Sequence, residues 1–169
     1  MLLDCGCPGE YPDWHRQDID LGNQCAHTLP IPMLLSMPLA YTVYLQRQQH
    51  NIDQLELKER WPGLVLTRSG LFRGSLTRLL EDSQSMSRFV RYLPAPFQVH
   101  GLLHHGNVST SAKPIRAIQQ QLLDSGRMPH ELYLCHLTCP RCSPQRGGDQ
   151  ILLLRRWSAH ARLQRRAGR

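Results

Sequence analysis

The residues best suited to chemistry are the cysteines, which gather near the two ends of the chain. The six positions are Cys5, Cys7, Cys25, Cys135, Cys139 and Cys142. Thiolates that bind one metal ion must converge on a point about 2.3 Å from each sulfur. Spacers of one or two residues favour this, because the backbone can turn within them and direct both sulfurs to the same side. The clustering therefore predicts a metal site.

The sharpest motif is Cys139-Pro140-Arg141-Cys142. It resembles the knuckle of zinc-ribbon proteins, in which a proline stiffens the loop and backbone amides point at the thiolates. Such a knuckle needs a hairpin around it. The sequence offers one, with a predicted strand ending at Cys135 and another beginning near Gln150.

A zinc ribbon would carry a second Cys-x-x-Cys, whereas this chain has Cys5-Gly6-Cys7 near its start. If the N-terminal arm folds back, these two cysteines join Cys139 and Cys142 in a closed four-thiolate site. The remaining candidate metal ligands would then form a second site. They are Cys25, His27, Cys135 and His136.

Two alternatives to structural zinc stay open. The spacing of Cys135, Cys139 and Cys142 resembles that of radical S-adenosylmethionine enzymes, in which three cysteines hold a four-iron cluster. Fewer than thirty residues follow Cys142, too few for the barrel of those enzymes, so an iron–sulfur cluster would need a further cysteine from the N-terminal arm.

The second alternative is a metalloenzyme. Cys25 and His27 could combine with Asp18 or Asp20 in an open site that activates water. As plain loop residues, the two aspartates would instead cap the turn at Gly22. The sequence does not decide whether the protein is an enzyme.

A weaker candidate pair is His100 and His104, which would share one face of a predicted strand over residues 97–104. Their imidazoles could meet a metal or a substrate there. Histidines at the end of a strand are also ordinary surface residues, and the pattern alone does not separate the two interpretations.

Length and composition predict one globular domain, with 169 residues and 41% hydrophobic side chains. The first residues lack the basic start and apolar run of a signal peptide. Prolines interrupt the most apolar stretch, 29–45, which is too short to span a membrane comfortably. These features indicate a cytoplasmic protein without a membrane segment, in which clustered cysteines are ligands or redox groups rather than disulfides.

The net charge of +7 is concentrated at the C-terminus, where no acidic residue follows Asp149. The sequence therefore predicts a basic arm over residues 155–169 that contacts nucleic acid or an acidic protein. Leu154, Trp157, Ala161 and Leu163 are spaced for one apolar stripe on a helix. The arginines concerned are Arg155, Arg156, Arg162, Arg165, Arg166 and Arg169.

The elements that must position these groups alternate without a βαβ rhythm, and we detect no internal repeat. We expect an irregular arm over 1–32, helices within 33–61, 75–81, 85–92 and 114–123, and strands at 64–66, 97–104, 131–135 and 150–154. The predicted class is α+β: one compact domain over 1–154, with a mostly antiparallel sheet, a few helices and a cysteine-rich metal knuckle. The predicted function is a zinc-binding protein with a regulatory or nucleic-acid-associated role.

Overall fold

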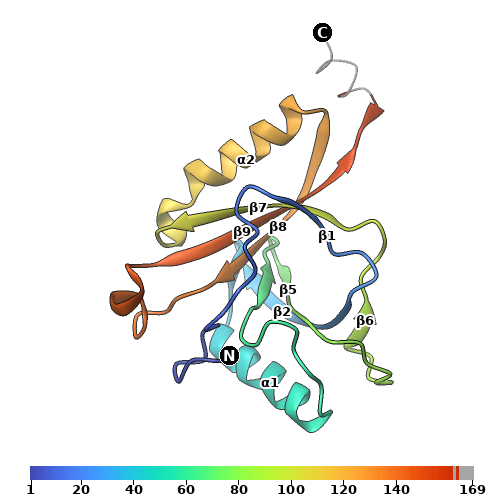
Figure 1. Ribbon diagram of the computed structural model, residues 1–169, viewed down its shortest axis with the longest axis vertical. Coiled ribbons are helices and arrows are strands. Elements are labelled where there is room, and N and C mark those ends of the chain that lie inside the picture. Colours follow the sequence, from blue (N-terminus) through green and yellow to red (C-terminus); the bar gives the residue numbers. More distant parts are fainter. Residues whose placement is uncertain (162, 164–169) are drawn as a thin grey trace.

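The computed structural model describes residues 1–161 and 163, and a single antiparallel sheet organises this part of the chain (Figure 1). Its strands are β1 (Asp18–Asp20), β2 (Cys25–Leu34), β3 (Met37–Pro38), β4 (Leu66–Arg68), β5 (Arg73–Leu79), β6 (Val90–Tyr92), β7 (Gln98–His105), β8 (Arg127–His136) and β9 (Gln150–Ala159). The helices are α1 (Tyr41–Gln54) and α2 (Ala112–Asp124), and 3-10 turns cover Val108–Thr110 and Ser143–Arg146. The predicted α+β class is confirmed.

Six of the nine strands form two halves of the sheet with the same plan. Each half contains a strand, a helix and two further strands: β2–α1–β4–β5 and β7–α2–β8–β9. The strand order is β1-β7-β9-β8-β4-β5-β2-β3, so the halves are mirrored across the β4–β8 pair, where Thr67 lies opposite Leu134. This repeat of architecture was not detected in the sequence, because the halves share an arrangement of elements rather than a residue pattern.

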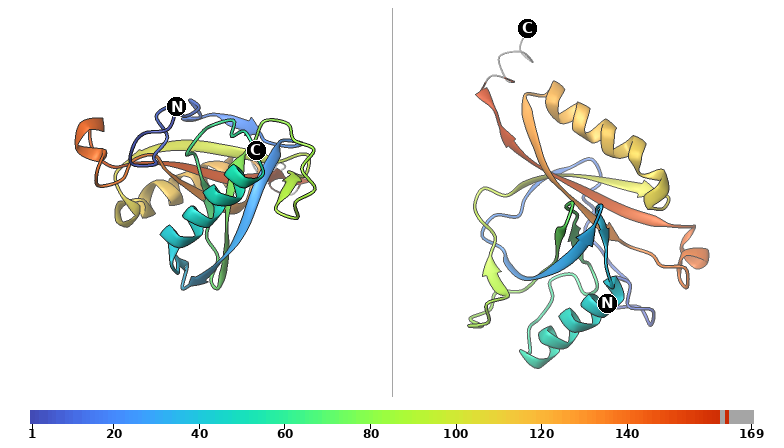
Figure 2. Two further views of the ribbon diagram at one scale, coloured as in Figure 1. Left: turned by 90° about the horizontal axis from the view of Figure 1, so that it is seen from below. Right: turned by 180° about the vertical axis from the view of Figure 1, so that it is seen from behind.

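Both helices pack on the same face of the sheet (Figure 2). The contacting residues recur at intervals of three and four, which gives each helix one apolar stripe. Helix α1 places Tyr41, Tyr44 and Leu45 against β2, β4 and β5. Helix α2 places Ile115, Ile118 and Leu122 against β7, β8 and β9.

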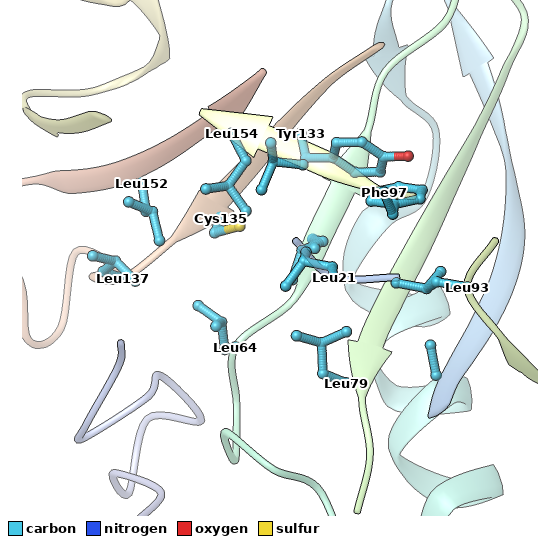
Figure 3. Close-up of a cluster of buried hydrophobic side chains, with 13 residues drawn as sticks. Leu21, Leu64, Leu79, Leu93, Phe97, Tyr133, Cys135, Leu137, Leu152 and Leu154 are labelled. Carbon is cyan, nitrogen blue, oxygen red and sulfur yellow. The ribbon is translucent and has the colours of Figure 1, made fainter. Parts of the chain in front are cut away.

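The opposite face of the sheet carries the main hydrophobic core (Figure 3). Alternation along β9 separates the faces, since Ile151 and Leu153 contact α2 whereas Leu152 and Leu154 belong to the main core. The N-terminal segment crosses this face, and the carbonyl oxygen of Gly101 accepts a hydrogen bond from the Arg16 amide. A Cβ at Gly101 would lie 2.1 Å from the Trp14 carbonyl oxygen, so only glycine allows this approach.

The arm predicted to be irregular over 1–32 instead contains β1 and eight of the ten residues of β2, because β2 tolerates Pro30 and Pro32. The amide of Thr28 donates to the carbonyl of Phe89, and the carbonyl of Pro32 accepts from the amide of Leu39. Both bonds lie on the side of β2 that faces away from β5. Backbone nitrogens two residues apart in a strand point to the same side. The nitrogens of Pro30 and Pro32, which carry no hydrogen, therefore lie on the same side as the amide of Thr28. They remove no hydrogen bond from the β2–β5 ladder.

The helices predicted over 75–81 and 85–92 are wrong. The first segment is strand β5, in which Leu76 contacts the α1 side while Ser75 and Thr77 face the other side. The second is mostly irregular, with Ser85 and Ser87 hydroxyls accepting from backbone amides two residues ahead, and it ends in β6. Such local side-chain bonds compete with helix formation.

Strand β9 continues five residues beyond the boundary predicted after Leu154. Arg155 and Arg156 therefore lie in the sheet and contact Gln119 and Glu131. Trp157 also belongs to the strand, which corrects the helical stripe expected there. The other arginines of the predicted arm, Arg162, Arg165, Arg166 and Arg169, lie outside the described residues.

Candidate metal centre

The N-terminal cysteines lie in a tight turn. The amide of Gly6 donates to the Leu3 carbonyl at 2.8 Å, and the amide of Leu3 donates to the Cys7 carbonyl at 3.0 Å. Gly6 has a φ of 83°, in the left-handed region that glycine adopts without strain. This turn lets Cys5 and Cys7 direct their sulfurs to one side although only one residue separates them.

The C-terminal cysteines lie in the hairpin between β8 and β9, as the predicted knuckle requires. The amides of Cys142 and Ser143 donate to the Cys139 carbonyl at 3.0 and 2.9 Å, which closes the turn. The amide of Cys139 points at Sγ of Cys142 at 3.3 Å. Gly147 and Gly148, both at positive φ, lead the chain back into β9.

The two turns meet, and the four sulfurs of Cys5, Cys7, Cys139 and Cys142 all lie within 4.8 Å of one another. The sulfurs of Cys139 and Cys142 are 3.9 Å apart. A tetrahedral site with bonds of about 2.3 Å has edges of about 3.8 Å, so this geometry fits one metal ion with small adjustments. The arrangement suggests a metal ion bound by four thiolates.

Two cysteines of the cluster, Cys139 and Cys7, have pKa values shifted in opposite directions. Burial alone would raise the pKa of Cys139, but backbone amides of Cys142 and Arg141 and the neighbouring thiols lower it to about 7. The pKa of Cys7 is raised, first by burial and then by hydrogen bonding with Cys139 and the other thiols. Cys139 is therefore the first of the two to form a thiolate, which is the metal-binding form.

A polar contact holds the two turns together. The Arg146 guanidinium donates to the carbonyl oxygens of Pro8 at 2.8 Å and Leu137 at 3.0 Å, which joins the N-terminal arm to the hairpin. The same guanidinium lies 5.8 Å from the ring centroid of Tyr11, whose hydroxyl donates to Gln150. The cluster is thus built on a preorganised contact rather than on sulfur atoms alone.

The other four predicted ligands are not brought together, which corrects the predicted second site. Cys25 and His27 lie on β2, whereas Cys135 and His136 lie on β8, with β4 and β5 between them. Three strand spacings amount to about 14 Å, too far for one metal ion. Within the described residues, only the cluster of Cys5, Cys7, Cys139 and Cys142 brings three or more such groups within reach of one ion.

These four residues occupy separate places in the fold instead, and Cys25 is buried on β2. Cys135 lies in the main core (Figure 3), and burial raises its pKa. His136 lies on the other face, with its ring 6.3 Å from that of Tyr41. His27 is fully buried, and its Nδ1 lies 3.2 Å from Nε2 of Gln48.

Asp18 and Asp20 do not form an open metal site with Cys25 and His27. Asp20 accepts from the amides of Gly22 and Phe97, so it caps the turn as its loop position suggests. Asp18 pairs with His100 at 2.9 Å and with Arg127 at 2.7 Å. Burial opposes this, but the hydrogen bonds from His100 and Arg127 lower the pKa of Asp18.

The histidine pair on β7 is also separated by its partners. His100 is buried against Asp18, whereas Nε2 of His104 lies 2.9 Å from the hydroxyl of Thr110. The two imidazoles are committed to different neighbours, and the predicted shared site is not formed.

Sequence reasoning missed a cavity on the face opposite the helices. Its lining includes Thr28, Arg68, Arg91, Tyr133 and Arg156, which come from five strands. No spacing along the chain links these positions, so only the sheet order could have identified them. The arginine excess, eighteen against two lysines, was the one available signal.

Comparisons with known proteins support the fold and do not assign a family. No protein-family model matches the chain, and no curated protein matches it. Among solved structures, it is similar to the crystal structure of the EcmrR C-terminal domain, with a TM-score of 0.63 and 8% sequence identity. The match covers 85% of this chain and 96% of that one, and at this identity it shows the fold alone. None of the helices in residues 1–161 is long and apolar enough to cross a membrane.

Proposed function

We propose that the protein is a zinc-binding protein in which the metal is structural and the role is regulatory rather than catalytic. The observation that carries the structural metal is the convergence of the sulfurs of Cys5, Cys7, Cys139 and Cys142 within 4.8 Å. Four thiolates fill a tetrahedral shell, which is typical of structural zinc. Catalytic zinc keeps a position open for water, and four cysteines leave none.

The position of the cluster supports a structural role. It joins residues 5–7 of the N-terminal arm to the loop between β8 and β9, two segments that no strand pairing connects. The arm then crosses the open face of the sheet and covers part of the main core. A metal at this point would hold the arm in place and so shape the face that the helices leave free.

Iron is the alternative occupant, because four thiolates also hold iron–sulfur clusters. Of the cysteines in the radical-enzyme spacing, Cys135 is buried in the core and lies outside the group of converging sulfurs. This favours a single ion over a cluster that uses Cys135, Cys139 and Cys142.

A second candidate role is contact with nucleic acid or an acidic protein through the basic C-terminus. The observation in its favour is the run after Asp149, which holds six arginines and no acid. Affinity for duplex DNA should then fall steeply with salt, with a slope near −0.9 per neutralised phosphate. Truncation after Ala159 should abolish binding of a labelled oligonucleotide. Equal binding by both forms would remove this role.

Elemental analysis of anaerobically purified protein tests the main proposal. We expect one equivalent of zinc and no visible absorption, because the filled d shell of zinc has no visible transitions. The Cys142→Ser variant should lose the metal, whereas Cys25→Ala, a matched change outside the cluster, should keep it. Brown protein with iron would favour the cluster, and wild-type protein without metal would overturn the proposal.

A further inference from the structure

A cavity of about 830 Å³ lies on the face of the sheet that the helices leave uncovered. Its floor comes from β2, β4, β5 and β8, and its rim from β9 and from the segment around β6. Pockets for small organic molecules have volumes of about 300–1,000 Å³. The cavity is therefore large enough for a ligand with several rings.

The charges around the cavity are strongly unbalanced. Of the residues that the structure describes, four arginines line it, Arg68, Arg88, Arg91 and Arg156, against one acid, Glu131, so this lining carries a net charge of +3. Glu131 is already paired with Arg156 at 3.3 Å. Among the described residues, no carboxylate forms an ion pair with the other three arginines. The unbalanced charge attracts an anion and opposes a cation.

Aromatic rings form one wall of the cavity. Phe97 and Tyr133 pack with their ring centroids 6.1 Å apart. The guanidinium of Arg156 lies 4.5 Å from the ring centroid of Phe97, and that of Arg88 lies 4.8 Å from that of Phe89. Rings with guanidinium groups over them offer apolar surfaces with positive charge beside them, which suit a planar anionic ligand.

Hydroxyl groups lie on the floor. Thr28 and Thr77 are buried, and their Oγ1 atoms are 3.2 Å apart. Ser75 lies beside them on β5 and is buried as well. These hydroxyls can donate hydrogen bonds to the oxygens of an acid group, which adds specific contacts to the general attraction of the arginines.

We propose that this cavity binds a planar organic anion, such as an aromatic carboxylate or sulfonate. Its acid group would lie between Arg68, Arg91 and the floor hydroxyls, and its rings would lie against Phe97 and Tyr133. A cation would have to compete with Arg156 for the single acid, Glu131. The cavity shares no residue with the cysteine cluster, so this inference does not depend on the metal.

The test uses the purified protein, residues 1–169, and three fluorescent probes. They are the anion 1-anilinonaphthalene-8-sulfonate, the neutral N-phenyl-1-naphthylamine, which lacks only the sulfonate, and the cation thioflavin T. We expect saturable binding of the anion at one site, weaker binding of the neutral probe and none of the cation. Arg68→Gln and Arg91→Gln should each weaken binding of the anion about tenfold. Arg47→Gln, an exposed change on α1, should leave it unchanged.

The Glu131→Gln variant gives the most decisive test, because the proposal predicts the direction in which its anion binding changes. Removing the one acid frees Arg156, so binding of the anionic probe should strengthen severalfold. Weaker anion binding in this variant, tighter binding of thioflavin T than of the anion, or equal binding by the Arg68 and Arg47 variants would each overturn the proposal. Near-ultraviolet circular dichroism and metal content of each variant separate loss of binding from loss of fold.

Discussion

The cysteines in loops come together in this protein, whereas the cysteines in strands stay apart. Cys5 and Cys7 in the N-terminal turn meet Cys139 and Cys142 in the hairpin loop, although more than a hundred residues separate the pairs. Cys25 on β2 and Cys135 on β8 stay apart, because intervening strands fix their distance. Loops can bring ligands to one point, whereas a sheet holds side chains at multiples of its strand spacing.

The largest effect that would sharpen this comparison is expected from removing one loop cysteine. Cys142→Ser should lose the metal and lower Tm by about 15 °C, since structural metal binding contributes several kcal/mol to folding. Cys135→Ala, a change in the strand group, should keep the metal and cost about 1–2 kcal/mol through lost core packing. Metal analysis and thermal unfolding of both variants check this. Metal loss in the Cys135 variant would contradict the separation of the two groups.

A second large effect should come from the buried network around His27, which contributes stability without metal. Arg78 donates to Gln48 and forms an ion pair with Glu59 at 2.8 Å, and both charged side chains are nearly inaccessible to solvent. Glu59→Gln should cost about 3 kcal/mol, because it leaves a buried charge without its partner. Urea unfolding measures this change. An accompanying fall in metal content would show that the network and the cluster act together.

A smaller difference between the loop cysteines and the strand cysteines is expected in the reactivity of their thiols. After chelation, Cys139, with a pKa of about 7, should react with iodoacetamide at pH 7 about tenfold faster than an ordinary thiol. Cys25 and Cys135 are buried, and burial raises the pKa of both. Mass spectrometry of partially labelled protein gives the order. Labelling of Cys135 before Cys139 would contradict the assignment.

The smallest effect concerns pH. His27 is buried and its pKa is lowered, first by burial and then by the charge of Arg78. The unfolded state therefore takes up a proton at a higher pH than the folded state, so stability is lost as pH falls below about 6.5. In metal-free protein, His27→Gln should reduce this loss between pH 7 and pH 5.5. An unchanged pH slope in urea unfolding would show that His27 is not responsible.

The sequence indicated the cysteine cluster because a spacer of one or two residues limits where the two flanking sulfurs can point. It could predict α2, β7 and the hairpin around Cys139 for a similar reason, since period and turn residues are local signals. It could not place β5, where Ser75 reads equally well as a helix cap. Nor could it show that β4 and β5 separate Cys25 from Cys135, because strand order depends on pairings far apart in the chain.

X-ray absorption at the zinc edge of the purified protein tests the central claim most directly. Coordination by Cys5, Cys7, Cys139 and Cys142 predicts one shell of four sulfurs at about 2.3 Å and no nitrogen or oxygen. A shell that includes histidine nitrogen would show that a histidine, such as His27 or His136, is a ligand of the metal. Three sulfurs with one oxygen would show an open site, and either result would contradict a closed structural centre.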